Sequence, residues 1–459
     1  MKQQVDYVIT NGDIFTGDRD FPYISDGAIA VAGNRIEALG PTQSLLAQYA
    51  PKQTFDARGA VVHPGMIDTH IHATSIALHS LPVTLDQVSP FKVSYTDVKV
   101  QTDDEITEAL TSAIAVAFLR RGYTCFMEAG TVLETDAFAS ALCRVGMRGM
   151  VSAPFGWDDI GHFATHAAGM ISERLLERAP ATRRAVIQRL EKELARNADK
   201  NTLVRGYVCL YGEGSATDGL TQDAYELAKR NGVGFNQHQG FIRTWYDIEA
   251  AKYGMSGVER LQKLGVLDER TTLTHLNVMS ESDVEMIRSQ RPGITWCPNN
   301  ALHRGVHPSD PCHFPKLIED GVCVSLGMDT TMYHPFGAAG IASLLLSAAV
   351  GQRLDDAEPF YMQTANAARN IGLAQELGAL SVGKRADIVV RAVEDITHTP
   401  LEHRGGLLAL SSSQIPVDLV MIDGRVVMQD GRVTNVDQDE VLGKALERRR
   451  ELLKRAQAN

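Results

Sequence analysis

The sequence predicts an α/β fold in which a (β/α)8 barrel of the TIM type is inserted into a small, discontinuous β-sandwich domain. Eight short apolar runs in the middle of the chain are each followed by polar or glycine-rich residues and then by a helical pattern, and groups of short strands occur at both ends. The 459 residues suffice for one large barrel and a smaller domain. We expect the barrel at 64–378 and the halves of the sandwich at 1–63 and 379–459, the second with a C-terminal helix.

The first 63 residues show short strands that are separated by turn signals. Asn11-Gly12 lies between apolar residues and is a typical hairpin signal. Gly33-Asn34 marks a second turn, and a helix is expected only around residues 42–49. This region is therefore expected to supply the first half of the sandwich.

Strand–helix alternation begins at Gly65 and predicts parallel strands with crossover helices. The capping sequence at 102–105 predicts a helix that ends at Gly122. The apolar run at 337–351 is too short to span a bilayer and is expected to form a buried helix. The eight expected barrel strands lie at residues 66–70, 123–129, 149–153, 203–211, 232–238, 271–275, 293–297 and 322–327.

The residues after the barrel are expected to complete the sandwich. Strands are predicted at 386–390, 417–422 and 425–428, and the last two are joined by an Asp423-Gly424 hairpin turn. A charged helix follows at 440–458. Its run of three arginines at 448–450 is expected to face solvent.

The composition excludes some classes of partner. A formal net charge of −11 and a pI near 5.7 argue against nucleic acid and anionic membranes as partners. The six cysteines are scattered without a Cys-x-x-Cys pair, and the N-terminus has no apolar signal region. We therefore expect a cytoplasmic protein without disulfide bonds, which binds a small-molecule substrate and forms a homo-oligomer.

His70 and His72 end the first expected barrel strand. Residues i and i+2 of a strand point to the same face, so both imidazoles can be directed at one metal ion. Taken alone, the pair could equally be two polar histidines on the wet face of a strand. An apolar lead-in and the residues at later strand ends favour the metal site.

Three later strand ends carry further candidate ligands, namely His238, His275 and Asp329. Each of them alone would more commonly be a satisfied polar residue of the core. Their ordered appearance at strand ends is the specific signal, because the chemistry of such barrels is found there. Nitrogen ligands with one carboxylate suit a divalent ion, with zinc as the first choice and iron, manganese or cobalt as alternatives.

These motifs make the chain similar to the amidohydrolase superfamily over nearly its whole length. It most resembles the branch that holds triazine hydrolases, guanine and S-adenosylhomocysteine deaminases, and phenylurea or thiocarbamate hydrolases. The resemblance implies that His275 hydrogen-bonds the metal-bound water or the leaving oxygen, and that the metal ligands are His70, His72, His238 and Asp329. The matching motifs are Pro64-Gly65-Met66-Ile67-Asp68-Thr69-His70-Ile71-His72, His238, His275, Trp296-Cys297-Pro298-Asn299-Asn300, Gly327-Met328-Asp329 and the segments 364–369 and 383–389.

One position departs from the pattern of this branch. Its deaminases and triazine hydrolases carry a glutamate three residues after the fifth-strand histidine, which passes a proton to a ring nitrogen. Here that position is Phe241, which has no titratable group. Hydrolysis of an amide, urea or carbamate does not need an acid that protonates a ring nitrogen. Asp329 can move the proton of the water to the leaving nitrogen while the metal and His275 stabilise the oxyanion. Two alternatives are that another carboxylate moves the proton or that the loop is aligned differently.

We expect one metal ion, because two-metal relatives use a carboxylated lysine on the fourth strand and residues 203–212 contain no lysine. Glu128, at the end of the second strand, could bridge a second metal, bind substrate or act as a hydrogen-bonded acid behind the ligands. Loops at strand ends usually line the pocket. The pocket candidates are His162, His166, Phe241, Trp296, Asn299, Asn300 and His303, although a histidine is more commonly a surface residue and a tryptophan more commonly core.

The sequence therefore predicts a metal-dependent amidohydrolase that cleaves a carbon–nitrogen bond of a small amide, urea or carbamate-like compound. Two alternatives stay open. One is a deaminase or dechlorinase of a nitrogen heterocycle. The other is a barrel without catalytic activity that serves in binding or assembly.

Overall fold

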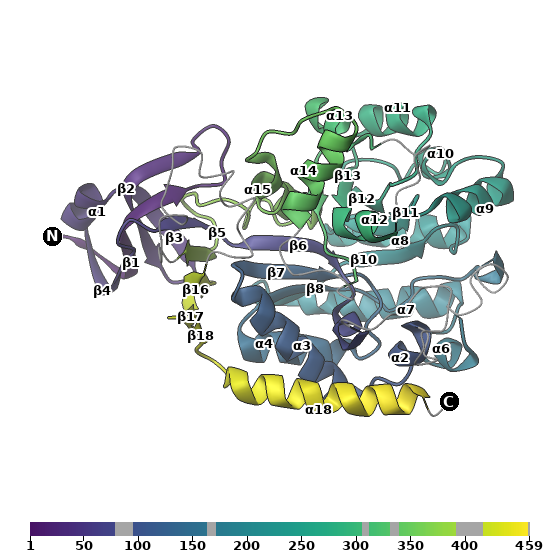
Figure 1. Cartoon of the computed structure of the whole chain (residues 1–459), viewed down its shortest axis with the longest axis horizontal. Helices are drawn as coiled ribbons and strands as arrows, with labels where there is room; N and C mark the ends of the chain where they lie inside the picture. The colour runs from purple at the N-terminus through teal and green to yellow at the C-terminus, as the bar shows by residue number, and fades with distance from the viewer. Residues whose placement is uncertain (79–94, 163–170, 305–311, 331–338, 392–415, 458–459) are drawn as a thin grey trace.

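The computed structural model describes residues 1–78, 95–162, 171–304, 312–330, 339–391 and 416–457 (Figure 1). A parallel barrel forms the centre, and a nine-stranded sheet lies at one end of it. Along the described segments, no helix is long and apolar enough to cross a bilayer.

The barrel is built from two parallel sheets, in the orders β6-β7-β8-β9 and β10-β11-β12-β13-β14. Only Tyr207 separates β9 from β10, so these two strands correspond to the fourth expected strand. A parallel bridge between Ile71 and Asp329 brings the end of β6 against the residues that follow β14 and completes the circle. The strands are β6 (Met66–Ile71), β7 (Tyr123–Glu128), β8 (Arg148–Val151), β9 (Val204–Gly206), β10 (Val208–Gly212), β11 (Phe235–Gln239), β12 (Thr271–His275), β13 (Gly293–Trp296) and β14 (Val324–Leu326). The predicted barrel fold is confirmed.

Strands from both ends of the chain share the nine-stranded sheet, in the order β18-β17-β16-β15-β5-β1-β2-β3 with β4 on β1. The two groups meet where β15 pairs antiparallel with β5, with Ile388 opposite Pro64. The strands are β1 (Gln3–Phe15), β2 (Tyr23–Ala32), β3 (Arg35–Pro41), β4 (Tyr49–Asp56), β5 (Val61–Pro64), β15 (Ile388–Arg391), β16 (Val417–Ile422), β17 (Arg425–Gln429) and β18 (Arg432–Val433). The exact domain boundaries stay a prediction.

Helices cover the barrel and extend from it. Large buried side chains such as Phe118 and Phe235 fill the space between the helices and the strands. The helices are α1 (Thr42–Gln48), η1 (Ala73–Leu78), α2 (Tyr95–Lys99), α3 (Asp104–Leu119), α4 (Thr135–Val145), α6 (Glu173–Arg178), α7 (Arg183–Leu194), η3 (Ala195–Ala198), α8 (Asp218–Asn231), α9 (Arg243–Tyr253), α10 (Gly257–Lys263), α11 (Glu281–Gln290), α12 (Pro298–Arg304), α13 (Phe314–Glu319), α14 (Ala339–Ala349), α15 (Glu358–Met362), α16 (Ala365–Asn370) and α18 (Gln438–Gln457).

The hairpin expected at Asn11-Gly12 is wrong. β1 runs through both residues, and its register against β2 shifts on either side of Gly12. Asn11 has φ of 54°, and a side chain at Gly12 would meet Val62. The turn signal therefore marks a bulge inside one long strand, where the chain needs both a left-handed residue and room for a close neighbour.

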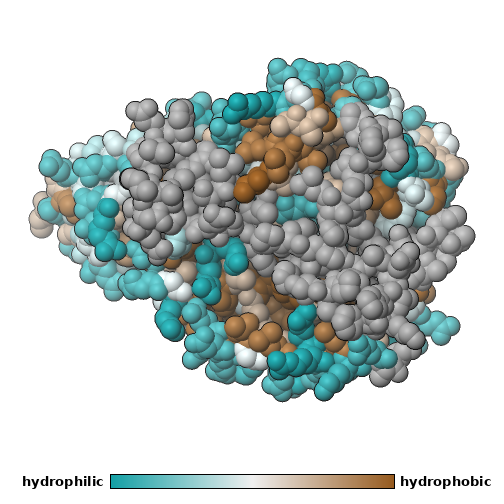
Figure 2. Space-filling view, viewed as in Figure 1, coloured by the Kyte–Doolittle hydropathy of each residue, from teal (hydrophilic) through white to brown (hydrophobic). Residues whose placement is uncertain are grey.

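Two predicted helix environments also differ from the structure. α14 buries mainly its small residues, and Leu345 is 58% exposed, so the helix is not fully buried. Figure 2 shows hydrophobic surface in the region of this helix. The arginine run of α18 does not simply face solvent, because α18 lies along α3 (Figure 1). There Arg448 pairs with Glu105, and Arg449 Nε donates to the Ala77 carbonyl at 2.7 Å.

The helix predicted after residue 102 is present as α3, but its cap differs. Asp103 is the N-cap, and its carboxylate accepts from the Ile106 N–H. Thr102 instead donates its hydroxyl to Glu134 at 2.8 Å. Adjacent threonine and aspartate can both cap a helix, so the sequence alone did not separate them.

Candidate metal centre

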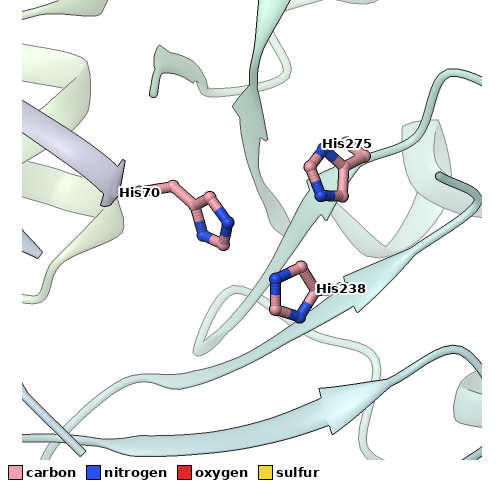
Figure 3. A group of neighbouring side chains, drawn as sticks. All are labelled: His70, His238 and His275. Atoms are coloured by element: carbon pink, nitrogen blue, oxygen red, sulfur yellow. The ribbon is translucent and has the colours of Figure 1, made fainter. Parts of the chain in front are cut away.

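Three histidines from separate barrel strands point toward one another at the C-terminal ends of the strands (Figure 3). They are His70 of β6, His238 of β11 and His275 of β12. The centroid of the His70 ring lies 4.8 Å from that of the His238 ring and 5.4 Å from that of the His275 ring. One nitrogen from each ring lies within 4.8 Å of the other two, which is the arrangement that a shared ion requires.

Asp329 and His72 complete a second group with His70. The Oδ1 atom of Asp329 lies 3.2 Å from His72 Nε2 and 4.0 Å from His70 Nε2. All three side chains are buried. His70 Nε2 has no hydrogen-bond partner among the described residues, so its lone pair is available to a cation. The residues therefore fit a divalent metal ion.

The electrostatics keep the imidazoles of His70 and His238 neutral, as metal binding requires. Burial, reinforced by His275 and His72, lowers the pKa of His238 to about 3. Burial, together with His238 and His72, also holds the pKa of His70 well below its usual value. His238 Nδ1 lies 2.7 Å from the Tyr211 carbonyl, so this nitrogen carries the proton and Nε2 is left free.

Asp329 is held as a carboxylate. Burial raises its pKa, but the adjacent His72 and His275 outweigh burial, and the net pKa is well below the usual value. Asn300 donates its side-chain N–H to the other oxygen, Oδ2. An ionised aspartate with one oxygen held in this way can present the other oxygen to a metal or to a proton.

Asp68 holds the two ligand-bearing strand ends together. Its carboxylate accepts from the His70 N–H at 3.0 Å and from the Met328 N–H at 3.1 Å. The Asp329 N–H donates to the His70 carbonyl at 2.7 Å beside this link. Sequence reasoning assigned Asp68 no role, although an acidic residue inside an apolar strand was a signal that could have identified it.

Two of the site residues have unusual backbone conformations. His275 has φ of 84° and Asp329 has φ of 60°, and both lie where their strands end. Residues other than glycine rarely adopt such φ angles, and the backbone strain costs of order 1–3 kcal/mol at each residue. The left-handed conformation turns the chain sharply at the position where the side chain enters the barrel mouth.

Aromatic rings flank the histidines. The ring of Phe241 lies 4.5 Å from that of His275 and 5.5 Å from that of Trp245, measured between centroids. The ring of Tyr211 lies 5.2 Å from that of His238 on another side. Phe241 is thus placed beside the site as expected, whereas Tyr211 was missed because nothing but its position at a strand end marks it.

Glu213 is a buried acid directly behind Phe241. Its Oε1 accepts from the Phe241 N–H at 2.9 Å. Burial raises the pKa of Glu213 to about 8, and the neighbouring Glu249 adds to the effect. At neutral pH the side chain is therefore mainly a neutral acid that ties the Phe241 loop to the end of β10. Sequence reasoning missed this residue.

Glu128 is hydrogen-bonded by Thr131, which fits one of the three roles that its position left open. Its carboxylate accepts from both the backbone N–H and the hydroxyl of Thr131. Within the described ranges, Glu128 is absent from the groups that could hold an ion. A third such group contains Cys297 with His275 and Asp329, but burial raises the pKa of this thiol well above its usual value, which disfavours the thiolate that binds metals.

The remaining pocket candidates divide into different environments. Trp296 stacks on Phe314 in the core with centroids 4.5 Å apart, so its assignment to the pocket is corrected to core. Asn299 is buried, and His162 Nε2 lies 2.9 Å from the Glu213 carbonyl. His303 lies in α12. His166 lies outside the described residues.

Comparisons with known proteins point to one enzyme family. The amidohydrolase family profile matches residues 61–427. Similar sequences include the 5-methylthioadenosine/S-adenosylhomocysteine deaminases of Syntrophobacter fumaroxidans, 25% identical over 447 residues and covering 96% of each chain, and of Desulforudis audaxviator, 27% identical over 468 residues and covering 97% of each chain.

Two solved structures share the fold over nearly the whole length. An adenosine deaminase from Xanthomonas campestris with bound zinc has a TM-score of 0.85 and is 19% identical, over 98% of this chain and 99% of that chain. A zinc complex of atrazine chlorohydrolase from Arthrobacter aurescens has a TM-score of 0.79 and is 17% identical, over 96% of this chain and 100% of that chain.

Proposed function

Because this chain belongs to the amidohydrolase family, we propose that it is a zinc-dependent hydrolase of a carbon–nitrogen bond in a small amide, urea or carbamate-like substrate. The observation that carries the choice of substrate is the ring of Phe241 beside His275, with centroids 4.5 Å apart. A phenylalanine cannot supply the proton that ring deamination needs on a heterocyclic nitrogen. An amide or urea requires only that the leaving nitrogen be protonated.

The residues proposed to hold the ion are His70, His72, His238 and Asp329. Their donor atoms lie in two overlapping groups that share His70, and zinc in related structures supports the choice of metal. A bound zinc ion would lower the pKa of a water molecule to about 7 and polarise the substrate carbonyl. We propose a single ion, because Glu128 is engaged by Thr131.

Asp329 is proposed to carry the proton. Its low pKa gives a carboxylate that can take the proton of the attacking water and return it to the leaving nitrogen. Asn300 holds Oδ2, so the transfer would use Oδ1. His275 lies beside His70 and close to Asp329. We propose that it stabilises the negative charge that develops on the substrate's carbonyl oxygen.

The pocket is proposed to favour an uncharged substrate with an apolar part. Phe241 and Tyr211 present ring faces next to the histidines, and Trp245 extends this surface. Such rings bind apolar or planar groups through dispersion and stacking. An anilide or phenylurea combines a planar ring with the required bond.

A second candidate is an aminohydrolase of a nitrogen heterocycle. The names of the similar sequences, which are deaminases of adenosine derivatives, favour it. Phe241 has no titratable group, so an acid from another position would have to protonate the ring.

Product analysis of the zinc-loaded protein tests the proposal. Anilides, phenylureas, carbamates and amino-substituted heterocycles, including 5-methylthioadenosine, would be offered at equal concentration. We expect release of an amine from the first three classes. Release of ammonia from a heterocycle alone would replace the first proposal with the second. Failure to bind zinc would contradict both.

We also propose that the protein works in the cytoplasm as a homo-oligomer. The six cysteines form no disulfide, which supports a reducing compartment. Sedimentation of the purified protein would determine its oligomeric state, and a monomer at micromolar concentration would contradict the second part.

A further inference from the structure

We propose that Thr131 is a positioning residue that fixes the tautomer of His72, and that Lys99 and Glu128 determine the direction in which the Thr131 hydroxyl donates. The inference rests on the metal site proposed above. It assigns a function to three buried residues that do not reach the ion themselves.

The hydroxyl of Thr131 is the centre of a buried polar cluster. Its Oγ1 lies 2.8 Å from His72 Nδ1, 2.8 Å from Glu128 Oε1 and 2.9 Å from Lys99 Nζ. All four side chains are buried, and Lys99 is only 2% exposed. The four residues come from the segments after β6 and β7, from the end of β7 and from α2, so the fold has to bring them together.

The hydrogens available on the four side chains determine the donor in each of the three hydrogen bonds at Thr131 Oγ1. A hydroxyl has one hydrogen and two lone pairs. A lysine ammonium can only donate and a carboxylate can only accept, so the hydroxyl accepts from Lys99 and donates to Glu128. Its remaining lone pair faces His72 Nδ1, which must therefore carry a hydrogen. Although burial lowers the pKa of Lys99 to about 8, the ammonium still predominates at pH 7.

Both charged groups have further partners that hold them in place. Lys99 Nζ also donates to Thr74 Oγ1 at 3.0 Å. Glu128 also accepts from the Thr131 backbone N–H at 3.0 Å. The hydroxyl therefore cannot reverse its direction without a loss of hydrogen bonds in a buried region, where such a loss is costly.

The consequence appears at the other nitrogen of the ring. When the hydrogen of a neutral His72 is on Nδ1, the Nε2 atom carries an unshared lone pair. This Nε2 atom lies 3.2 Å from Asp329 Oδ1, which is also an acceptor. Two acceptors at this distance repel each other unless a cation lies between them. Two donor atoms that would each lie about 2.0–2.1 Å from one zinc ion can be at most about 4.2 Å apart, and the 3.2 Å between these two atoms satisfies that limit. The cluster thus directs His72 toward a metal rather than toward a hydrogen bond with Asp329.

Zinc affinity and the ring nitrogens of His72 test the proposal. We would compare wild type, Thr131→Val, Thr131→Ser and Thr111→Val by competition with a chelator and by ¹⁵N NMR of labelled histidine. Thr111 is a matched control, because it is equally buried in α3 and its hydroxyl has no hydrogen-bond partner among the described residues. We expect the valine at 131 to weaken zinc binding about 10–100-fold, the usual effect of losing such a partner of a metal ligand.

The zinc affinities of Thr131→Ser and of the Thr111→Val control should lie within about threefold of that of wild type, because both variants keep a hydroxyl at position 131. In the zinc-loaded wild type, NMR should show the hydrogen on Nδ1 of His72. Equal zinc affinity of Thr131→Val and Thr111→Val would overturn the proposal, as would a hydrogen on Nε2 in the wild type, a result that needs no variant to fold. Absence of zinc binding by the wild type would instead refute the metal site.

Discussion

The ring of Phe241 packs against the imidazole of His275 with their planes inclined at 41°. The contact places a hydrocarbon surface beside the imidazole that is proposed to stabilise the negative charge on the substrate's carbonyl oxygen. Phe241 is 7% exposed, and its backbone is fixed by Glu213. The chemistry next to His275 therefore depends on one apolar side chain, and replacing it should change the reaction.

Substituting Phe241 with glutamate should shift the activity toward ring deamination. The carboxylate could donate to a ring nitrogen, a contribution that is typically worth 10²–10⁴-fold. We expect ammonia release from an amino-heterocycle to rise at least about 10-fold over the matched Phe241→Gln variant. Both variants should lose activity on anilides through the loss of the apolar contact. Equal ammonia release by the two variants would show that the position does not limit deamination.

Substituting Asp329 with asparagine should remove activity while the fold persists. Asparagine tolerates the left-handed backbone at φ of 60°, so no additional strain is expected. It cannot take a proton, and kcat/KM should fall by about 10²–10⁴-fold or more. Circular dichroism and Tm would confirm folding. Retention of more than about a tenth of kcat/KM would rule out Asp329 as the proton carrier.

The free energy of unfolding should depend on the ionisation of Glu213. Its pKa is raised to about 8 in the folded state from 4.5, so the unfolded chain releases this proton first. The stabilisation is fully present below pH 4.5 and is lost as pH rises to 8, at up to about 1.4 kcal/mol per pH unit. Urea unfolding of Glu213→Gln should show a shallower fall over this range. The exposed Glu177→Gln variant is the control and should match wild type.

Removal of the metal should lower Tm, and zinc should restore it in proportion to the logarithm of its free concentration. Binding to the folded state alone stabilises it by about 4 kcal/mol when the ligand is at 1,000 times Kd. Thermal melts of chelator-treated protein at several zinc concentrations would measure the effect. His70→Asn should respond much less, because His70 belongs to both ligand groups. An identical zinc response of the two proteins would place the ion elsewhere.

The sequence predicted those parts of the molecule that depend on local pattern. The eight barrel strands and the strand-end positions of His70, His238 and Asp329 follow from apolar runs and from the point at which each run stops. The Asp423-Gly424 turn between β16 and β17 was equally local, and it is confirmed.

The parts that were missed depend on distant neighbours. Thr131 contacts His72 across 59 positions of sequence, and Asp68 reaches the Met328 N–H across 260. The bulge at Asn11 carries the same residues as a hairpin turn, and only the partners of β1 distinguish the two. Trp296 was ambiguous for the same reason, because the ring of Phe314 against which it stacks comes from a later helix.

The pairing of β5 with β15 has a consequence for the order of events during synthesis. The first 64 residues leave the ribosome tens of seconds before Ile388, at ordinary rates of translation. Throughout that interval one edge of the early sheet stays without the partner that later covers it, while the barrel folds next to it. Until β15 has emerged, this edge is therefore open to pairing with strands of other chains, and a chaperone that binds exposed strands would protect it.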